Sequence, residues 1–426
     1  MREKLLQYIW QFQYYNKNDL ATSEGEPLQI IHQGNINTNQ GADFSEAKIK
    51  IGNTILAGNI ELHTRSSDWN VHKHTDDKNY GNIILHVVWE HDLDIKDIND
   101  NMLPTLELNS RVSKILLSKY EQMMNNSIFI PCENHAYSIS DLTLLNWKQR
   151  LLAERLEARS QLIFSFLKEN NYNWEQTFWW FLAKNFGIKV NSEAFEKIAR
   201  SLSIQIIAKH KNQIQTLEAL LMGQAGLLDF DFSEDYPLML QKEFKFYKTK
   251  YNLQQPAIQL FFLRMRPANF PTIRLAQLAM LINHSSHLFS HVKEEADVAK
   301  IKKLLKVTAN DYWHYHYILG EVSEFKKKVL GDQMIDNIII NTIVPILFAY
   351  GLYHGREEYK SKAFNWLEQT NSEKNVITKG FEVLQFSNKN SFDSQAYIQL
   401  KNEYCNKKRC LNCSIGNSIL KNDHQL

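Results

Sequence analysis

The chain changes its hydrophobic periodicity once, near residue 140, and this change limits the folds open to it. Before that point short apolar runs alternate with polar residues and turns, as strands do, and after it apolar residues recur at helical spacing. The expected strands are 28–32, 44–51, 54–63, 83–90 and 103–108, with helices over 2–15 and around 69–80. We therefore predict a mixed α/β or α+β domain followed by a helical one.

The second part is expected to be mostly helical, with 146–166 and 174–186 as its clearest segments. Its dense aromatic residues, such as Trp179 and Trp180, are more typical of a packed core than of a base-stacking surface. A chain of 426 residues also exceeds what one hydrophobic core usually serves, about 250–300 residues. The predicted domains are an α/β domain over 1–135, a helical domain over 136–400 and a cysteine-containing segment over 401–426.

Charge and hydropathy argue against two classes of protein, those with a global basic field and those that span a membrane. Lys plus Arg (49) nearly cancel Asp plus Glu (47), so the chain has no global basic field for binding nucleic acid, and any such binding must be local. No apolar run approaches the roughly 18 residues of a membrane span, and the N-terminus lacks a signal-peptide pattern. We expect a cytoplasmic protein that does not enter a membrane.

Three residues on a predicted hairpin form the first candidate site. Asp43 starts one strand, and Glu61 and His63 are two residues apart on the next, so their side chains share a face. A turn at Gly52-Asn53 would bring the three together. Two neighbouring carboxylates repel unless a cation neutralises them, and oxygen ligands suit Mg²⁺ or Mn²⁺. Gln33 or Glu24 could add a contact from the preceding segment.

Residues 41–44 (GADF) and 58–63 (GNIELH) resemble the PD-(D/E)xK motif of the restriction-endonuclease-like nucleases. The order helix, three strands, helix, strand is also similar to the core of that superfamily. The resemblance implies that Asp43 and Glu61 bind the metal and that His63 takes the place of the usual lysine. Ala42 stands where the motif has proline.

A second resemblance covers nearly the whole chain. Residues 59–69, 84–90, 264–271 and 410–413 look like a bacterial family known only as a domain of unknown function. That resemblance implies no activity, so the nuclease interpretation rests on the motif of the N-terminal core.

His72, His74, Asp76 and His86 extend the cluster of acids and histidines. The spacing of His72 and His74 predicts two imidazoles on one face of an extended segment, a common two-histidine metal arrangement. Together with Asp76 they are candidate metal ligands. The same residues are also compatible with a zinc-dependent hydrolase.

The four cysteines are candidate ligands of a second metal. Cys405, Cys410 and Cys413 lie within nine residues, and Cys132 is the one other thiol of the chain. Three plus one would complete a tetrahedral Zn²⁺ site or a [4Fe–4S] site. Some nucleases of the resembled superfamily build a cluster from one distant cysteine and three C-terminal ones, with a different spacing. Reduced, unbound cysteines are the alternative.

Several side chains that donate hydrogen bonds lie close together in the sequence of the helical part. They are candidates for binding phosphate: Arg264, Arg266, Asn269 and Arg274. They would either hold a nucleic-acid backbone or pair with acids to join the two domains.

These features predict a metal-dependent nuclease or phosphodiesterase acting on nucleic acid, DNA or RNA. Two alternatives remain open. One is a non-catalytic module that keeps the nuclease-like fold and binds nucleic acid or protein. The other is the zinc-dependent hydrolase built on His72 and His74.

Overall fold

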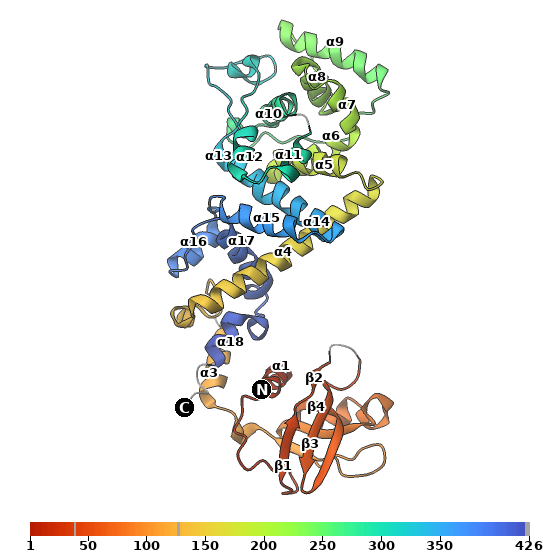
Figure 1. Cartoon of the computed structure of the whole chain (residues 1–426), viewed down its shortest axis with the longest axis vertical. Coiled ribbons are helices and arrows are strands. Elements are labelled where there is room, and N and C mark those ends of the chain that lie inside the picture. The colour runs from red at the N-terminus through yellow and green to blue at the C-terminus, as the bar shows by residue number, and fades with distance from the viewer. Residues whose placement is uncertain (38–39, 126–127, 286, 422–426) are drawn as a thin grey trace. The chain divides into compact units, whose positions relative to one another are not determined.

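The computed structural model of the chain describes residues 1–37, 40–125, 128–285 and 287–421, without the side chains of 136–138. The chain divides into two compact units, residues 1–147 with the segment from Lys401 onward, and residues 148–400. The predicted fold class is confirmed, since a mixed sheet near the N-terminus is followed by a large helical region (Figure 1).

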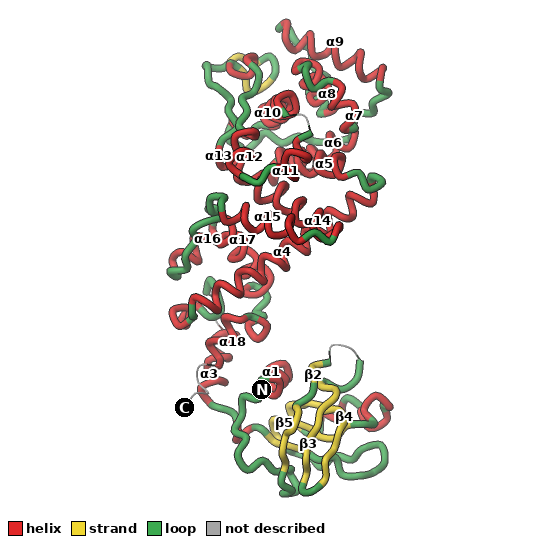
Figure 2. Tube along the Cα trace, viewed as in Figure 1, coloured by secondary structure: helices red, strands yellow, loops and turns green. Residues whose placement is uncertain are grey.

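One curled sheet organises the first unit, and Figure 2 shows its strands in yellow. The sheet runs in the order β1-β3-β4-β5-β6, with β2 paired to β3. β1, β3 and β4 are antiparallel, whereas β5 is parallel to β4 and β6 is parallel to β5. The elements of this unit are α1 (Glu3–Gln11), β1 (Leu28–His32), β2 (Asn35–Ile36), β3 (Phe44–Ile51), β4 (Thr54–Arg65), α2 (Asp68–Val71), β5 (Ile83–Glu90), β6 (Thr105–Glu107), α3 (Lys114–Asn125) and α18 (Ser414–Lys421).

The hairpin of β3 and β4 has the register that its sequence predicts. Ile51 pairs with Thr54 across the two-residue turn, and Gly52 has a φ of 53°, a conformation that glycine adopts without steric cost. Ala47, Ile49 and Ile51 alternate with more exposed residues, so one face of β3 is buried.

Helix α1 packs on β4 with an apolar stripe. Leu6, Ile9 and Trp10 are fully buried, and the Trp10 indole donates to the carbonyl of Gln33. The helix ends at Gln11 rather than at the predicted residue 15, because Gln13 has a φ of 54° and leaves the helical conformation.

The segment between β4 and β5 is a chain of short helical turns. After α2, 3₁₀ turns cover His74–Asp76 and Lys78–Tyr80. Trp69 anchors the segment in a small core with Ile95 and Leu103, against which Tyr80 and Ile83 pack. The predicted helix around 69–80 is thus present only as the short α2 and two 3₁₀ turns.

The second unit consists almost entirely of helices, drawn red in Figure 2. Its aromatic-rich α5 is a core helix, as predicted, since Phe178, Trp179 and Phe181 are buried. α4 begins in the first unit and continues into the second. The helices are α4 (Asp141–Glu169), α5 (Trp174–Phe186), α6 (Ile188–Ser201), α7 (Ile204–Lys209), α8 (Ile214–Gln224), α9 (Asp235–Lys250), α10 (Pro271–His284), α11 (Leu288–Glu294), α12 (Val298–Leu305), α13 (Asp332–Ile338), α14 (Val344–His354), α15 (Glu357–Glu368), α16 (Val376–Val383) and α17 (Ser391–Gln399), with a two-stranded ribbon of β7 (His316–Ile318) and β8 (Glu321–Val322).

Among the described residues, one helical stretch is long and apolar enough to cross a membrane. It runs from Asp332 to His354 through α13, a π-helical turn at Ile339–Ile343 and α14, with a mean hydropathy of 1.6, and 72% of its most apolar part is buried inside the protein. That burial is typical of the core helix of a soluble protein, because a membrane span would turn much of its apolar surface outward.

Glu218 is a carboxylic acid buried completely inside the helical unit. One of its oxygens, Oε2, accepts hydrogen bonds from the Tyr236 hydroxyl at 2.6 Å and the Trp313 indole at 3.1 Å, whereas Oε1 has no partner among the described residues. Burial raises the pKa of Glu218 to about 7. The folded protein therefore keeps a proton on this acid that the unfolded chain releases above its ordinary pKa of about 4.3.

This difference makes stability depend on pH, with a sign opposite to that of a salt-bridged acid. The stabilisation of the fold by the neutral Glu218 is complete below about pH 4. It is lost as pH rises to about 7 and beyond, because ionisation of this acid is disfavoured in the folded protein. We predict that Glu218→Gln, which mimics the neutral acid, raises the free energy of unfolding at pH 8 by on the order of 3 kcal/mol relative to its effect at pH 4.

Urea unfolding followed by circular dichroism at both pH values checks this prediction. Glu193→Gln is the matched control, since the side chain of Glu193 is 83% exposed and should not change the pH dependence. Equal effects of Glu218→Gln at both pH values would contradict a neutral Glu218.

Candidate metal centre

Two carboxylates meet where β3 begins beside β4. The Asp43 N–H donates to Glu61 Oε2 at 3.0 Å, and the Leu62 N–H donates back to Asp43 Oδ2 at 3.2 Å. The remaining Asp43 oxygen accepts from Gln7 Nε2 of α1 at 2.8 Å. Three of the four carboxylate oxygens are therefore engaged, and Glu61 Oε1 is the one that faces the histidines.

Two histidines lie beside that oxygen, and a third contacts one of them. His63 Nε2 lies 3.7 Å and His74 Nε2 lies 3.6 Å from Glu61 Oε1. His72 Nδ1 is 3.0 Å from His63 Nε2. One nitrogen of each imidazole lies within 4.8 Å of the other two, a spacing that a single metal ion can bridge.

The backbone between His72 and His74 brings both rings to His63. We predicted an extended segment here, and that prediction is wrong: α2 ends just before His72, a 3₁₀ turn begins at His74, and Lys73 between them has a φ of 58°. This left-handed residue reverses the chain within a single residue. Trp69 anchors the segment, because its ring is buried and its indole donates to Thr75 Oγ1 at 2.9 Å.

The surroundings of His63 and His74 favour the neutral imidazole, the form that binds a metal. Burial, followed by the neighbouring His74 and His72, lowers the pKa of His63 to about 3. Burial lowers the pKa of His74 as well. His63 Nδ1 lies 2.8 Å from Nε2 of the buried His86. If His63 donates from Nδ1 to His86, its Nε2 lone pair points into the cluster. His86 thus selects the tautomer of His63 in which Nε2 can bind a metal.

The two acids are in an environment that favours a bound cation. Burial raises the pKa of both Asp43 and Glu61, and the pKa of Glu61 is raised further by the charge of Asp43. A proton or a metal ion must therefore compensate the pair. His74 Nε2 is buried and has no hydrogen-bond partner among the described residues, although it faces Glu61. An orphaned ring nitrogen beside a carboxylate and two imidazoles fits a transition metal better than Mg²⁺.

Asp76 is a predicted ligand that the structure leaves outside this group. It is exposed in the 3₁₀ turn after His74, and the three-histidine set does not include it. Gln33 instead accepts from Gln13 Nε2 at 2.9 Å, and Glu24 is exposed.

The sequence did not reveal three contributors. Gln7 holds Asp43 from α1, Tyr80 stacks on His74 with ring centroids 3.8 Å apart, and Trp69 anchors the segment. His86 was grouped with the cluster, but its support of His63 depends on the parallel pairing of β4 and β5, where Glu61 lies opposite His86. Only a known strand order could have shown this.

The predicted arginine group divides into a buried and an exposed part. Arg274 is buried and donates to Gln277 Oε1 at 2.9 Å and to Asn269 Oδ1 at 2.6 Å. Arg264 and Arg266 are exposed. Arg274 and Asn269 thus form a bonded unit inside the helical region, while Arg264 and Arg266 remain available to solvent.

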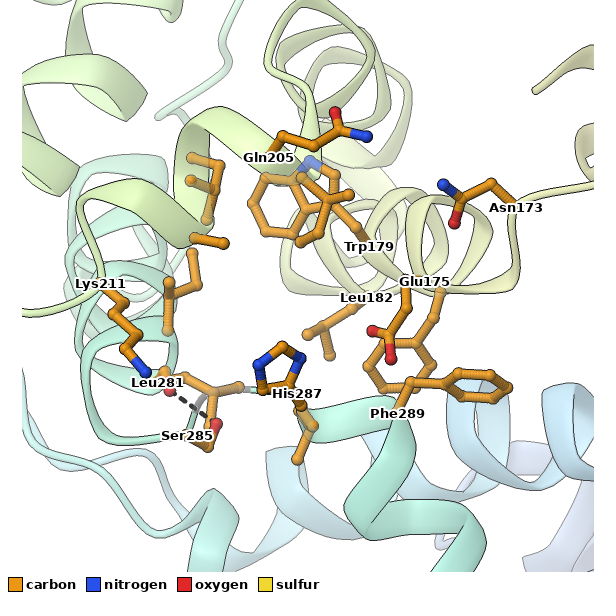
Figure 3. A pocket seen from close by; sticks show the side chains of 16 residues that line it. Asn173, Glu175, Trp179, Leu182, Gln205, Lys211, Leu281, Ser285, His287 and Phe289 are labelled. Carbon is orange, nitrogen blue, oxygen red and sulfur yellow. Dashed lines mark hydrogen bonds between the residues drawn. The ribbon is translucent and has the colours of Figure 1, made fainter. Parts of the chain in front are cut away.

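The helical unit has an apolar pocket of its own, bounded by α5, α7, α10 and α11 (Figure 3). Its volume is about 370 Å³, and Trp179, Leu182 and Phe289 contribute to its lining. Glu175 is among the polar groups at this pocket, and its Oε1 accepts from Ser290 Oγ at 3.3 Å. None of the predicted site residues lines it.

A family model matches residues 3–376, nearly the whole chain, and its description is a protein of unknown function, DUF2851. The chain belongs to this family. The match spans the sheet and the histidine cluster but ends before the C-terminal cysteines. No curated protein and no solved structure matches the chain.

The anchoring by Trp69 gives a testable consequence. We predict that Trp69→Ala lowers the free energy of opening of the β4–β5 region by about 3–5 kcal/mol, because it leaves a cavity in a small core. Hydrogen–deuterium exchange of the β4 and β5 amides measures this energy. Val71→Ala in the same helix is the matched control, since Val71 is 72% exposed and should change the energy by less than about 0.5 kcal/mol. Equal effects of the two variants would contradict the anchoring.

Proposed function

We propose that the protein is a metal-dependent phosphodiester hydrolase acting on nucleic acid, with its centre at His63, His72, His74 and Glu61. The convergence of three imidazoles, two of them beside one buried carboxylate oxygen, carries this proposal. Mn²⁺ and Zn²⁺ are the preferred ions, since nitrogen ligands suit transition metals. We also propose a cytoplasmic location.

The order of elements supports a nuclease-like core. α1 is followed by the antiparallel strands β1, β3 and β4, with the short β2 paired to β3, then by the helical segment with α2, and then by β5 parallel to β4. This is the order that the PD-(D/E)xK resemblance implies, with Asp43 at the start of the second of these strands and Glu61 and His63 on the third. His63 stands at the lysine position and is neutral, so a bound cation would have to supply the positive charge that lysine normally brings.

The chain's own groups have distinct roles in such a reaction. A bound metal ion lowers the pKa of a coordinated water and stabilises charge on the phosphate. Glu61 Oε1 is placed to take the proton of the attacking water, because its other oxygen is already held by the Asp43 N–H. Asp43 positions Glu61 through the reciprocal backbone bonds, and the exposed His72 marks the side from which a substrate can approach.

Metal binding and cleavage can be measured together. We predict that Mn²⁺ or Zn²⁺ at 100 times its Kd stabilises the N-terminal unit by about 2.7 kcal/mol. Glu61→Gln should reduce cleavage of a panel of single- and double-stranded DNA and RNA at least about 100-fold, because it removes the proton acceptor. Thermal shift with each metal and gel-based cleavage check these two results.

Asp76→Asn is the matched control for that experiment. It removes an acid of the same segment that is exposed, so both the thermal shift and the cleavage should persist. Metal stabilisation with no cleavage of any substrate would contradict the hydrolase while leaving the metal site.

Burial favours a second candidate function, a binding protein with a structural metal. Glu61 is 6% and His63 is 1% exposed, so much of the centre is closed to a large substrate. In that case His63→Ala should lower the melting temperature and abolish the metal-dependent shift, without any activity to lose. A nucleic-acid or protein ligand would then bind elsewhere, for example at the exposed Arg264 and Arg266.

A further inference from the structure

The four cysteines of the chain come together although they are far apart in the sequence. Cys132 precedes a 3₁₀ turn at Glu133–Ser138, Cys405 ends a π-helical turn, Cys410 begins another 3₁₀ turn and Cys413 immediately precedes α18. All four belong to the first unit, all are free thiols, and Cys132, Cys410 and Cys413 are buried. The C-terminal segment thus returns to residues near 132.

The C-terminal segment lies against the residues that lead to Cys132, since the Lys408 ammonium donates to the Met124 carbonyl and the Lys401 ammonium lies 5.0 Å from the centre of the Phe129 ring. Burial raises the pKa of all four thiols, and the charges of Cys413 and Cys410 raise the pKa of Cys132 and of Cys405 further. Three of these thiols are buried and Cys405 is half-buried. Thiols gathered in this way are costly to ionise beside one another unless a metal binds them.

Two backbone groups favour the thiolate of Cys413. Burial raises the pKa of this thiol, and the backbone N–H groups of Gly416 and Ile415 offset part of that rise. A neutral thiol is a weak acceptor, whereas a metal-bound thiolate is commonly stabilised by such donors. Gly416 also lets the loop close, since a Cβ there would lie 2.3 Å from the carbonyl oxygen of Cys410.

The spacing of the sulfurs distinguishes a single Zn²⁺ site from a [4Fe–4S] site. A single Zn²⁺ with Zn–S bonds of about 2.3 Å would hold its four sulfurs about 3.8 Å apart. Among the described donor groups, the three histidines lie within 4.8 Å of one another, and no three of the cysteine sulfurs do. A [4Fe–4S] cluster spreads its four thiolates more widely, because each binds a different iron atom.

We propose that Cys132, Cys405, Cys410 and Cys413 bind a [4Fe–4S] cluster that fastens the C-terminal segment to the residues around Cys132. Each thiol loses its proton as its sulfur binds iron. The Lys408 ammonium, which donates to the Met124 carbonyl, lies near enough to Cys410 to favour its thiolate. This site is independent of the histidine centre and of the proposed hydrolase activity.

The test is the metal content of the full chain purified without oxygen. We expect about four iron and four acid-labile sulfide per chain, with a brown colour that fades on reduction. Cys132→Ser and Cys413→Ser should each lose most of the iron. Lys407→Ala should retain it, because Lys407 lies between the ligands but is exposed and pairs with Glu403. His63→Ala should retain it too, which separates this site from the histidine centre.

A measurement on the unmodified protein covers the case in which the serine variants do not fold. Thiol alkylation of the native protein should find the four cysteines shielded, and alkylation after acid and chelator have removed the iron should find them reactive. One zinc per chain without sulfide would overturn the cluster. Four reactive thiols in metal-free, anaerobically purified protein would overturn the site altogether.

Discussion

Two reciprocal hydrogen bonds hold Asp43 and Glu61 together across β3 and β4, and the candidate centre depends on them. The Asp43 N–H donates to the Glu61 carboxylate, and the Leu62 N–H donates to the Asp43 carboxylate. Both acids are therefore fixed by backbone groups, one on β4 and one on the residue that precedes β3. Their burial makes a nearby cation or proton necessary, and their geometry directs Glu61 Oε1 toward the imidazoles of His63 and His74.

The histidines depend in turn on a small core that is remote in sequence from the hairpin. Trp69, Ile95 and Leu103 hold the turns between β4 and β5, and Lys73 reverses the chain so that His72 and His74 both reach His63. His86 supports His63 from the adjacent parallel strand. The centre is thus assembled from one hairpin, one anchored loop and one neighbouring strand.

Much of this arrangement could be predicted from local patterns. Strands β1, β3 and β5 have the predicted bounds, because alternating apolar residues and the Gly52-Asn53 turn are local signals. The meeting of Asp43, Glu61 and His63 follows from that hairpin. The roles of Gln7, Tyr80 and His86 could not be predicted, since they depend on how α1, the 3₁₀ turns and β5 pack. The reversal at Lys73 was also missed, because a left-handed lysine has no signature in the sequence.

Anomalous diffraction from crystals of the protein soaked in Mn²⁺ or Zn²⁺ tests the metal centre most directly. A peak bonded to His63 Nε2, His72 Nδ1 and His74 Nε2, at about 2.0–2.1 Å from each for zinc, is the expected result. The peak should also have Glu61 Oε1 beside it, either as a fourth ligand or bonded to a metal-bound water. Metal peaks at other surface sites with none among the three histidines would contradict the account.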